Sequence, residues 1–167
     1  MKRNRVVVFA VVIAALLTSC GPDAKYPIDD RPNVKVDKRL FGKWILTEEH
    51  EGKYRVDSDI VYTLTKENDY KYHVLLRAKK DGRYVEDSTT AYLSKIDKEP
   101  FVNIYLKDDP GGYIFLKIVK VSADKILATS LADTMTVTSA AQVRTLMTTN
   151  LKNPAFYKDT VEFSRVK

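Results

Sequence analysis

The chain has 167 residues, of which 44% are hydrophobic, and it carries a formal net charge of +6 and a single cysteine. This length suits one domain, or one domain with a tail, and is too short for an α/β barrel, while the apolar fraction is too high for a disordered chain. The positive charge invites a nucleic-acid partner. However, Lys2, Arg3 and Arg5 lie in the first 19 residues, and without them 25 basic residues face 22 acidic ones. The remaining basic residues are dispersed, which argues against nucleic acid.

The N-terminal residues have the pattern of an export signal. A basic stretch ending at Arg5 precedes an unbroken apolar run of twelve residues, Val6–Leu17. A run of this length is too short for a transmembrane helix, which needs about 20 residues, but it suits the core of a signal peptide. The run closes with Leu17-Thr18-Ser19-Cys20, which resembles the bacterial lipobox.

This resemblance implies that residues 1–19 are a lipoprotein signal peptide and that Cys20 is the lipidation site. In that family the cysteine thiol receives a diacylglyceryl group, and acyl chains anchor a protein without a spanning helix. Cys20 is the only cysteine, so it has no disulfide partner within the chain. Gly21, where an aspartate would signal retention in the inner membrane, favours the outer membrane of the cell envelope. The alternative is a secreted protein that is cut elsewhere and keeps a free cysteine.

The stretch of residues 20–39 differs in composition from the rest of the chain. It is polar, contains Pro22, Pro27 and Pro32, carries both signs of charge and has no apolar periodicity. Proline and mixed charge favour an extended chain. We therefore expect an extended tether over residues 20–39 and a globular domain over residues 40–167, which is long enough for one core.

Strand patterns dominate the globular part. Apolar and polar residues alternate with a period of two in Ile60–Thr65, Tyr70–Arg77, Val102–Leu106 and Thr160–Val166. Turn sequences separate the runs at Asn68-Asp69, Asp81-Gly82, Asp109-Pro110-Gly111-Gly112 and Ser122-Ala123-Asp124. Many strands joined by short hairpins predict a mainly β protein, an antiparallel up-and-down barrel of eight strands.

One helix interrupts this pattern near the C-terminus. Ser139 is followed by Gln142 at the spacing of a capping box, and Val143, Leu146 and Met147 recur at helical intervals. Asn153-Pro154 ends the helix before the last strand. Its apolar stripe is expected to cover the outside or an open end of the barrel.

With this order of elements, Gly42-Lys43-Trp44 resembles the G-x-W motif that opens the first strand of lipocalins. The domain thus resembles the lipocalin-like (calycin-type) domains of small bacterial lipoproteins. In that fold the tryptophan seals the closed end of the barrel, and a basic side chain from the last part of the barrel packs across the indole. The resemblance implies that Gly42, Trp44 and Arg165 close the barrel, with Arg144 as a second choice for the basic residue. The alternative is that Trp44 is a core residue of another β-sandwich.

Tyrosines are concentrated in the strands, since eight of the ten lie between Tyr54 and Tyr113. If their alternating registers face inward, they form an amphipathic cavity that suits a small apolar or amphipathic ligand. The residues predicted to line this cavity are Tyr62, Tyr70, Tyr72, Val74, Tyr92 and Ile104. The alternative is that tyrosine fills a solid core, in which case the protein is a non-enzymatic interaction module for another envelope protein.

Motifs of catalysis are missing from the sequence. It has no G-x-S-x-G, no H-E-x-x-H and no Gly-rich phosphate loop. His50 and His73 are the only histidines, and His73 falls on a polar strand face. Acidic residues such as Glu48, Glu49 and Asp57 are near each other but lack EF-hand spacing, and carboxylates in loops are usually solvated. We therefore predict no catalytic residue, no metal and no cofactor, and a weak enzyme on this scaffold remains a third hypothesis.

Overall fold

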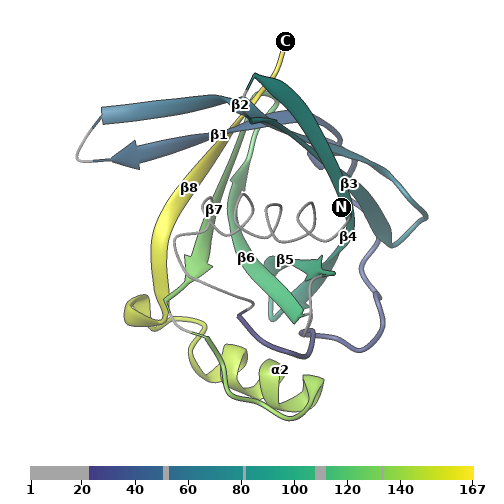
Figure 1. Cartoon of the computed structure of the whole chain (residues 1–167). Coiled ribbons are helices and arrows are strands. Elements are labelled where there is room, and N and C mark those ends of the chain that lie inside the picture. The colour runs from purple at the N-terminus through teal and green to yellow at the C-terminus, as the bar shows by residue number, and fades with distance from the viewer. Residues whose placement is uncertain (1–22, 51–52, 81, 108–111, 133) are drawn as a thin grey trace, which may run out of the picture.

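The protein is described by a computed structural model that places residues 23–50, 53–80, 82–107, 112–132 and 134–167. Eight antiparallel strands form one closed barrel, in which each strand pairs with the next and the last pairs with the first (Figure 1). The strands are β1 (Gly42–His50), β2 (Lys53–Lys66), β3 (Lys71–Lys80), β4 (Arg83–Ile96), β5 (Glu99–Leu106), β6 (Gly112–Val121), β7 (Lys125–Leu131) and β8 (Tyr157–Arg165). The predicted up-and-down eight-stranded barrel is confirmed.

The strands arise from the period-two patterns, because every second side chain points into the barrel. On β3, for example, Tyr72, Val74 and Leu76 are buried. The tight connections fall where the sequence carries residues that tolerate positive φ: Gly82 has a φ of 76° between β3 and β4, and Asp97 a φ of 54° between β4 and β5. The interior is a hydrophobic cluster made of Leu40, Trp44, Tyr72, Val74, Ala91, Leu93, Val102, Leu116, Ile118, Ile126 and Ala128.

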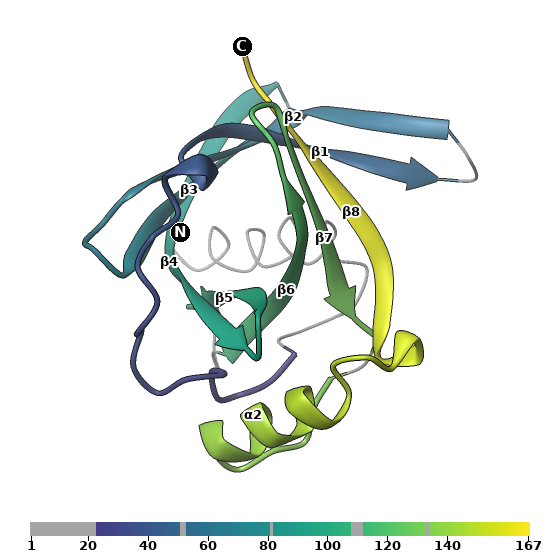
Figure 2. The same ribbon diagram turned by 180° about the vertical axis from the view of Figure 1, so that it is seen from behind.

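In the described part of the chain there is one α-helix, α2 (Ala140–Thr149), and it lies near the C-terminus, as the sequence predicts. Its N-terminus is capped reciprocally, because Ser139 accepts a hydrogen bond from the Gln142 amide and the Gln142 side chain accepts one from the amide of Thr138. Two short 3₁₀ turns flank the barrel, η1 (Lys38–Leu40) before β1 and η2 (Pro154–Phe156) before β8. Figures 1 and 2 show that α2 lies outside the ring of strands.

The N-terminal segment, residues 23–39, corrects the expectation of an extended tether. Its first part packs on the outside of the barrel, where both Ala24 and Ile28 are only 1% exposed, whereas Val34 and Val36 pack against the interior cluster. Ala24 and Tyr113 of β6 exchange two backbone hydrogen bonds, of 2.8 and 3.3 Å. The domain therefore includes the residues from Asp23 onward. The sequence did not predict this packing, because the buried apolar residues of the segment are isolated, are spaced irregularly among prolines and follow neither a helical nor a strand period.

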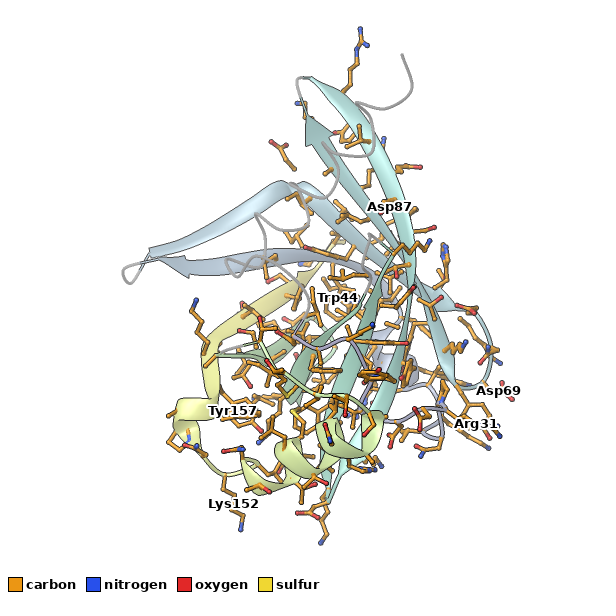
Figure 3. All side chains as sticks on the ribbon, turned by 60° about the horizontal axis from the view of Figure 1, so that its bottom comes forward. Arg31, Trp44, Asp69, Asp87, Lys152 and Tyr157 are labelled. Atoms are coloured by element: carbon orange, nitrogen blue, oxygen red, sulfur yellow. The ribbon has the colours of Figure 1, made fainter. Side chains whose placement is uncertain are left out.

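A second hydrophobic cluster lies between the barrel, the N-terminal segment and α2. We call it the outer layer; its buried members are Ala24, Ile28, Ile96, Phe101, Phe115, Leu131, Met135, Val143, Met147 and Leu151. In Figure 3, Trp44 lies among the strands, whereas Lys152, at the end of α2, and Arg31, in the N-terminal segment, lie at the periphery. The molecule thus has one core inside the barrel and another on its outer face.

Candidate ligand-binding site

The three residues expected to close the barrel lie together at one end of it. Trp44 is fully buried, and its indole Nε1 donates a 2.9 Å hydrogen bond to the carbonyl oxygen of Leu40. The guanidinium carbon of Arg165 lies 4.2 Å from the centroid of the indole ring, a cation–π contact. This is the arrangement that the lipocalin resemblance implies.

The guanidinium of Arg165 also binds three backbone carbonyls. Its nitrogens donate to the oxygens of Phe41 at 2.7 Å, Arg39 at 3.0 Å and Ala123 at 2.5 Å. The planar fork of arginine can reach several acceptors at once, which a lysine cannot. Arg165 thereby joins the approach to β1, the turn between β6 and β7, and its own strand.

Gly42 leaves room for this guanidinium. A Cβ atom at position 42 would lie 2.3 Å from Nη1 of Arg165, and the φ of Gly42 is +130°, which side chains rarely tolerate. Glycine is thus required at position 42 because the guanidinium of Arg165, which packs on the Trp44 ring, occupies the space that a side chain would need.

Arg144, the second choice for the basic residue, has another role. Both of its terminal nitrogens donate 3.0 Å hydrogen bonds to the carbonyl of Lys95 on β4. It also forms a 3.2 Å ion pair with Asp29. Arg144 therefore fastens α2 to the barrel and to the N-terminal segment.

Tyr72 belongs to the filled end of the barrel rather than to a cavity. Its ring packs edge-on against Phe41, with 5.7 Å between the centroids, and its hydroxyl accepts a 2.5 Å hydrogen bond from the amide of Asp37. Burial raises the pKa of the Tyr72 hydroxyl to about 12. Together with Trp44, this side chain occupies the space that a ligand would need at this end.

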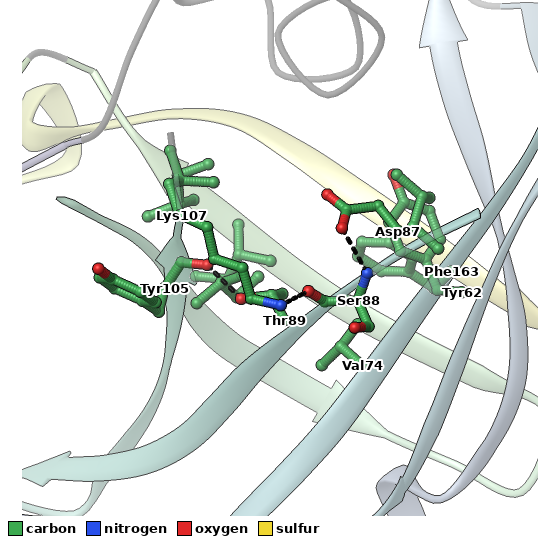
Figure 4. A pocket seen from close by; sticks show the side chains of 13 residues that line it. Tyr62, Val74, Asp87, Ser88, Thr89, Tyr105, Lys107 and Phe163 are labelled. Carbon is green, nitrogen blue, oxygen red and sulfur yellow. Dashed lines mark hydrogen bonds between the residues drawn. The ribbon is translucent and has the colours of Figure 1, made fainter. Parts of the chain in front are cut away.

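The other part of the interior holds a pocket of about 90 Å³ (Figure 4). Three residues expected at a cavity, Tyr62, Val74 and Ile104, line it. The other residues that line it are Leu76, Asp87, Ser88, Thr89, Tyr105, Leu106, Lys107, Ile114, Leu116 and Phe163. Most of these side chains are apolar, so the pocket favours an apolar group.

The size of the pocket limits what it can bury. Its volume is about 90 Å³. Sites for drug-sized ligands occupy roughly 300–1,000 Å³. The pocket can therefore hold a narrow apolar group, such as the end of an aliphatic chain, while the rest of a larger ligand would remain outside.

One side of the pocket is polar, and we call Asp87, Ser88, Thr89 and Lys107 the polar rim. Asp87 accepts a 2.7 Å hydrogen bond from the Ser88 amide. The hydroxyl of Thr89 donates to the carbonyl of Tyr105, and the ammonium of Lys107 donates to the carbonyl of Ser88 (Figure 4). Because Tyr105 and Lys107 are exposed, the pocket reaches the surface at this rim.

The polar rim coincides with a break in the sheet. The ladder between β4 and β5 ends at the pair Ala91 and Ile104, although β4 extends back to Arg83. Among the described residues, 83–90 pair only with β3. Beyond the end of this ladder, hydrogen bonds from the side chains of Thr89 and Lys107 connect the two strands. These hydrogen bonds can break without disrupting the backbone pairing of β4 with β5.

Besides Tyr72, two further predictions for the cavity are wrong. Tyr92 lies on the outer face of β4, where its hydroxyl donates a 2.8 Å hydrogen bond to the carbonyl of Asp29 and where burial raises its pKa. Its neighbours Ala91 and Leu93 point inward instead. Tyr70 lies in the turn before β3 and is 39% exposed. A period of two identifies the two faces of a strand but does not tell which of them is inside when both are apolar.

Sequence reasoning missed several lining residues. Leu106 has the same parity as Ile104 and could have been found from it. Phe163 comes from β8, and its ring meets that of Tyr62 at a centroid distance of 5.7 Å. That contact depends on barrel closure. Lys107 carries no signal in the sequence that distinguishes it from other lysines of the chain.

Other expected features lie elsewhere. The signal peptide of residues 1–19 and Cys20 lie outside the described residues, as do the side chains of His50 and of the acidic residues at positions 48–57. His73 is exposed. Within the described ranges, no three His, Cys, Asp or Glu side chains are grouped so that they could hold a metal ion. Nor does the described part of the chain contain a helix long and apolar enough to cross a membrane.

Comparisons with family models, with curated proteins and with solved structures found no match to this chain.

Proposed function

We propose that this protein is a lipid-anchored, lipocalin-like barrel of the bacterial cell envelope that binds a small apolar or amphipathic ligand. The observation that carries the proposal is an apolar pocket inside a closed barrel, bounded on one side by polar groups that reach the surface. Such a combination of apolar walls and a few polar groups is typical of small-molecule sites. The proposal includes no catalytic residue, metal or cofactor, and no nucleic acid.

The shape of the pocket defines the ligand further. Its apolar part must be narrow, because only about 90 Å³ is free between Tyr62, Ile104 and Phe163. Its polar part would lie at the polar rim, where Lys107 and Asp87 offer both signs of charge. An amphiphile with one slim apolar end meets both conditions.

A filled pocket is the sharpest test of ligand binding. The full-length protein would be purified from its own host in mild detergent and examined by native mass spectrometry. We expect a bound small molecule in the natural protein, its loss in Ile104→Trp, which fills the pocket, and its retention in Val119→Trp, at an exposed strand position. A natural protein that carries no ligand, or an Ile104→Trp variant that keeps it, would contradict the proposal.

Anchoring through Cys20 rests on the sequence pattern and is tested separately. Cys20→Ala should accumulate as an unprocessed precursor that lacks the acyl groups, whereas Ser19→Ala, which keeps a small residue beside the cleavage site, should be processed normally. Mass spectrometry of the N-terminus measures both. Normal cleavage and unchanged membrane association of Cys20→Ala would rule out the lipoprotein assignment. Separation of the two membranes by density then tests the expected outer-membrane location.

The small size of the pocket favours one alternative, an envelope interaction module on a largely filled barrel. Trp44 and Tyr72 fill one end of the interior, so exposed groups such as Tyr84 and Tyr105 would then provide the affinity. Cross-linking in intact cells distinguishes the two functions. A specific protein partner whose capture survives Ile104→Trp would support the module, because that binding would not need the pocket.

A further inference from the structure

The first described residue of the chain is fixed to the barrel at a defined place. Asp23 is buried, and its carboxylate accepts a 2.6 Å hydrogen bond from the Phe115 amide on β6. Its backbone carbonyl accepts a 2.5 Å hydrogen bond from the Met135 amide. These contacts determine where the preceding residues, and any lipid that they carry, leave the domain.

That place adjoins the polar rim of the pocket. Ala24 pairs with Tyr113 through two backbone hydrogen bonds. Tyr113 is in turn the partner of Tyr105 in the ladder between β5 and β6, and their ring centroids are 5.4 Å apart. Tyr105 lines the pocket and is 40% exposed. A continuous path of neighbours therefore connects the entry of the chain with the surface side of the pocket.

The distance from the anchor to this place is short. Three steps between consecutive Cα atoms, of about 3.8 Å each, separate Cys20 from Asp23, so the two Cα atoms are at most about 11 Å apart. Phe115, which Asp23 contacts, lies seven residues before Ser122, a separation of roughly 23 Å at about 3.3 Å per residue. This is about twice the length of the connection, so Cys20 cannot reach the turn of residues 122–124 at the far end of β6.

We infer that the short connection from Cys20 holds the polar rim of the pocket against the bilayer, so that the barrel exchanges an amphiphile directly with the membrane surface. The exposed groups at this place suit such a surface, because tyrosine and lysine combine an apolar body with a polar tip that stays at the interface. The break between β4 and β5 opens toward the same side. The inference rests on the proposed anchor, and it adds the orientation of the pocket and the source of the ligand.

The orientation can be measured with single fluorescent labels. Because Cys20 is the only cysteine of the chain and lipidation blocks its thiol, one introduced cysteine is labelled selectively. The lipidated full-length variants Lys107→Cys, at the polar rim, and Ala123→Cys, in the turn at the far end of β6, would carry the same dye. Each would be reconstituted into vesicles of phosphatidylethanolamine and phosphatidylglycerol that contain a lipid with a quencher in its headgroup.

We expect the dye at position 107 to lose most of its fluorescence and the dye at position 123 to keep it. Equal quenching at the two positions, or stronger quenching at 123, would overturn the inference. An insertion of about ten Gly and Ser residues before Asp23 adds roughly 15–20 Å of reach and should abolish the difference while the protein stays anchored. If the difference persists after the insertion, the short connection is not its cause.

These outcomes are separable from a failure of the proposed function. If Cys20→Ala is cleaved normally and still stays in the membrane as the natural protein does, the proposed anchor is wrong, independently of the fluorescence results. If the anchor is established and the dye at position 107 remains bright, only the orientation fails. Binding of a ligand by the natural protein and its loss in Ile104→Trp are unaffected by either result.

Discussion

The inside of the barrel and the outer layer are both buried, but different interactions hold them. The interior cluster consists of hydrophobic residues that alternate regularly along the strands. The outer layer also contains Asp23, Ser94 and Asn103, three of the four buried polar residues in the described part of the chain. Hydrophobic alternation thus produces the barrel, whereas a few directional hydrogen bonds determine where the N-terminal segment lies on it.

Asn103 is the centre of these directional contacts. It is completely buried, and its side-chain oxygen accepts a 3.0 Å hydrogen bond from the Ile28 amide. Its amide nitrogen donates to the Ser94 hydroxyl at 2.9 Å. The carboxamide has a donor and an acceptor, so one side chain satisfies groups from the N-terminal segment and from β4. A hydrophobic residue at this position could bury the same area but could not specify the register of the segment.

Removing the largest interior side chain should have the largest effect. Trp44→Ala is expected to lower the free energy of unfolding by about 3–5 kcal/mol, because a buried tryptophan leaves a cavity that the barrel fills only in part. Denaturation followed by far-UV circular dichroism measures this, with the exposed Val119→Ala as the control. A loss below about 1 kcal/mol, no larger than a typical surface substitution, would show that the interior does not dominate stability.

In the outer layer, Asn103→Ala should destabilise the protein by about 3 kcal/mol, because the Ile28 amide and the Ser94 hydroxyl lose their partner in a buried place. The expected effect is local. Hydrogen exchange of the Ile28 amide should accelerate strongly, while the strand amides inside the barrel stay protected. Ser94→Ala, which removes a single contact of this group, is the matched milder variant. Uniform acceleration over all strands would mean that the outer layer and the barrel unfold as one unit.

The buried carboxylate makes the outer layer sensitive to pH. Burial raises the pKa of Asp23 to about 6, although its hydrogen bond from Phe115 opposes the shift. In the unfolded chain the value is near 3.8, so the folded state binds the proton more tightly and stability falls as pH rises from about 4 to about 6. At about 1.4 kcal/mol per pKa unit, the loss is roughly 3 kcal/mol.

Asp23→Asn should remove this part of the pH dependence, because the carboxamide stays neutral and can still accept from Phe115. Urea denaturation at a series of pH values between 4 and 7 measures it. The exposed Asp30→Asn, on the same segment, is the control. A pH dependence in Asp23→Asn equal to that of the natural protein would exclude Asp23 as its source.

The smallest expected effect concerns the closed end of the barrel. Gly42→Ala should cost about 1–2 kcal/mol, since the new Cβ meets the guanidinium of Arg165 and the backbone keeps a positive φ. In an Arg165→Ala background the same substitution should cost less, with a coupling of about 1 kcal/mol in a double-mutant cycle. Additive effects would indicate that backbone strain alone requires the glycine.

The two regions also differ in how well the sequence predicts them. The alternation of apolar residues was sufficient to predict β3, where Tyr72, Val74 and Leu76 share the inner face. The spacing of Ser139 and Gln142 was sufficient to predict where α2 begins. The barrel could therefore be predicted from local patterns. The outer layer could not, because Ala24 and Ile28 are isolated apolar residues whose partners lie far along the chain.

The residues that line the pocket could be predicted only in part. Tyr62 and Ile104 followed from alternation, whereas Tyr92 was assigned to the wrong face, because both faces of β4 are buried at that point. The contribution of Phe163 depends on the pairing of β8 with β1, and that pairing is a property of the closed barrel rather than of either strand. The free volume of the pocket depends on how all these side chains pack together, and this packing cannot be predicted from any single stretch of the sequence.

The attachment of Asp23 to Phe115 has a consequence for the order of folding. The two residues are 92 positions apart, and the contact of Arg165 with Phe41 joins residues 124 positions apart. Contacts of such separation form late, after the hairpins between neighbouring strands. If the chain is exported from its N-terminus, as proposed, the N-terminal segment crosses the membrane first, and β6, on which that segment packs, crosses much later. We therefore expect residues 23–28 to be among the last to reach their native places.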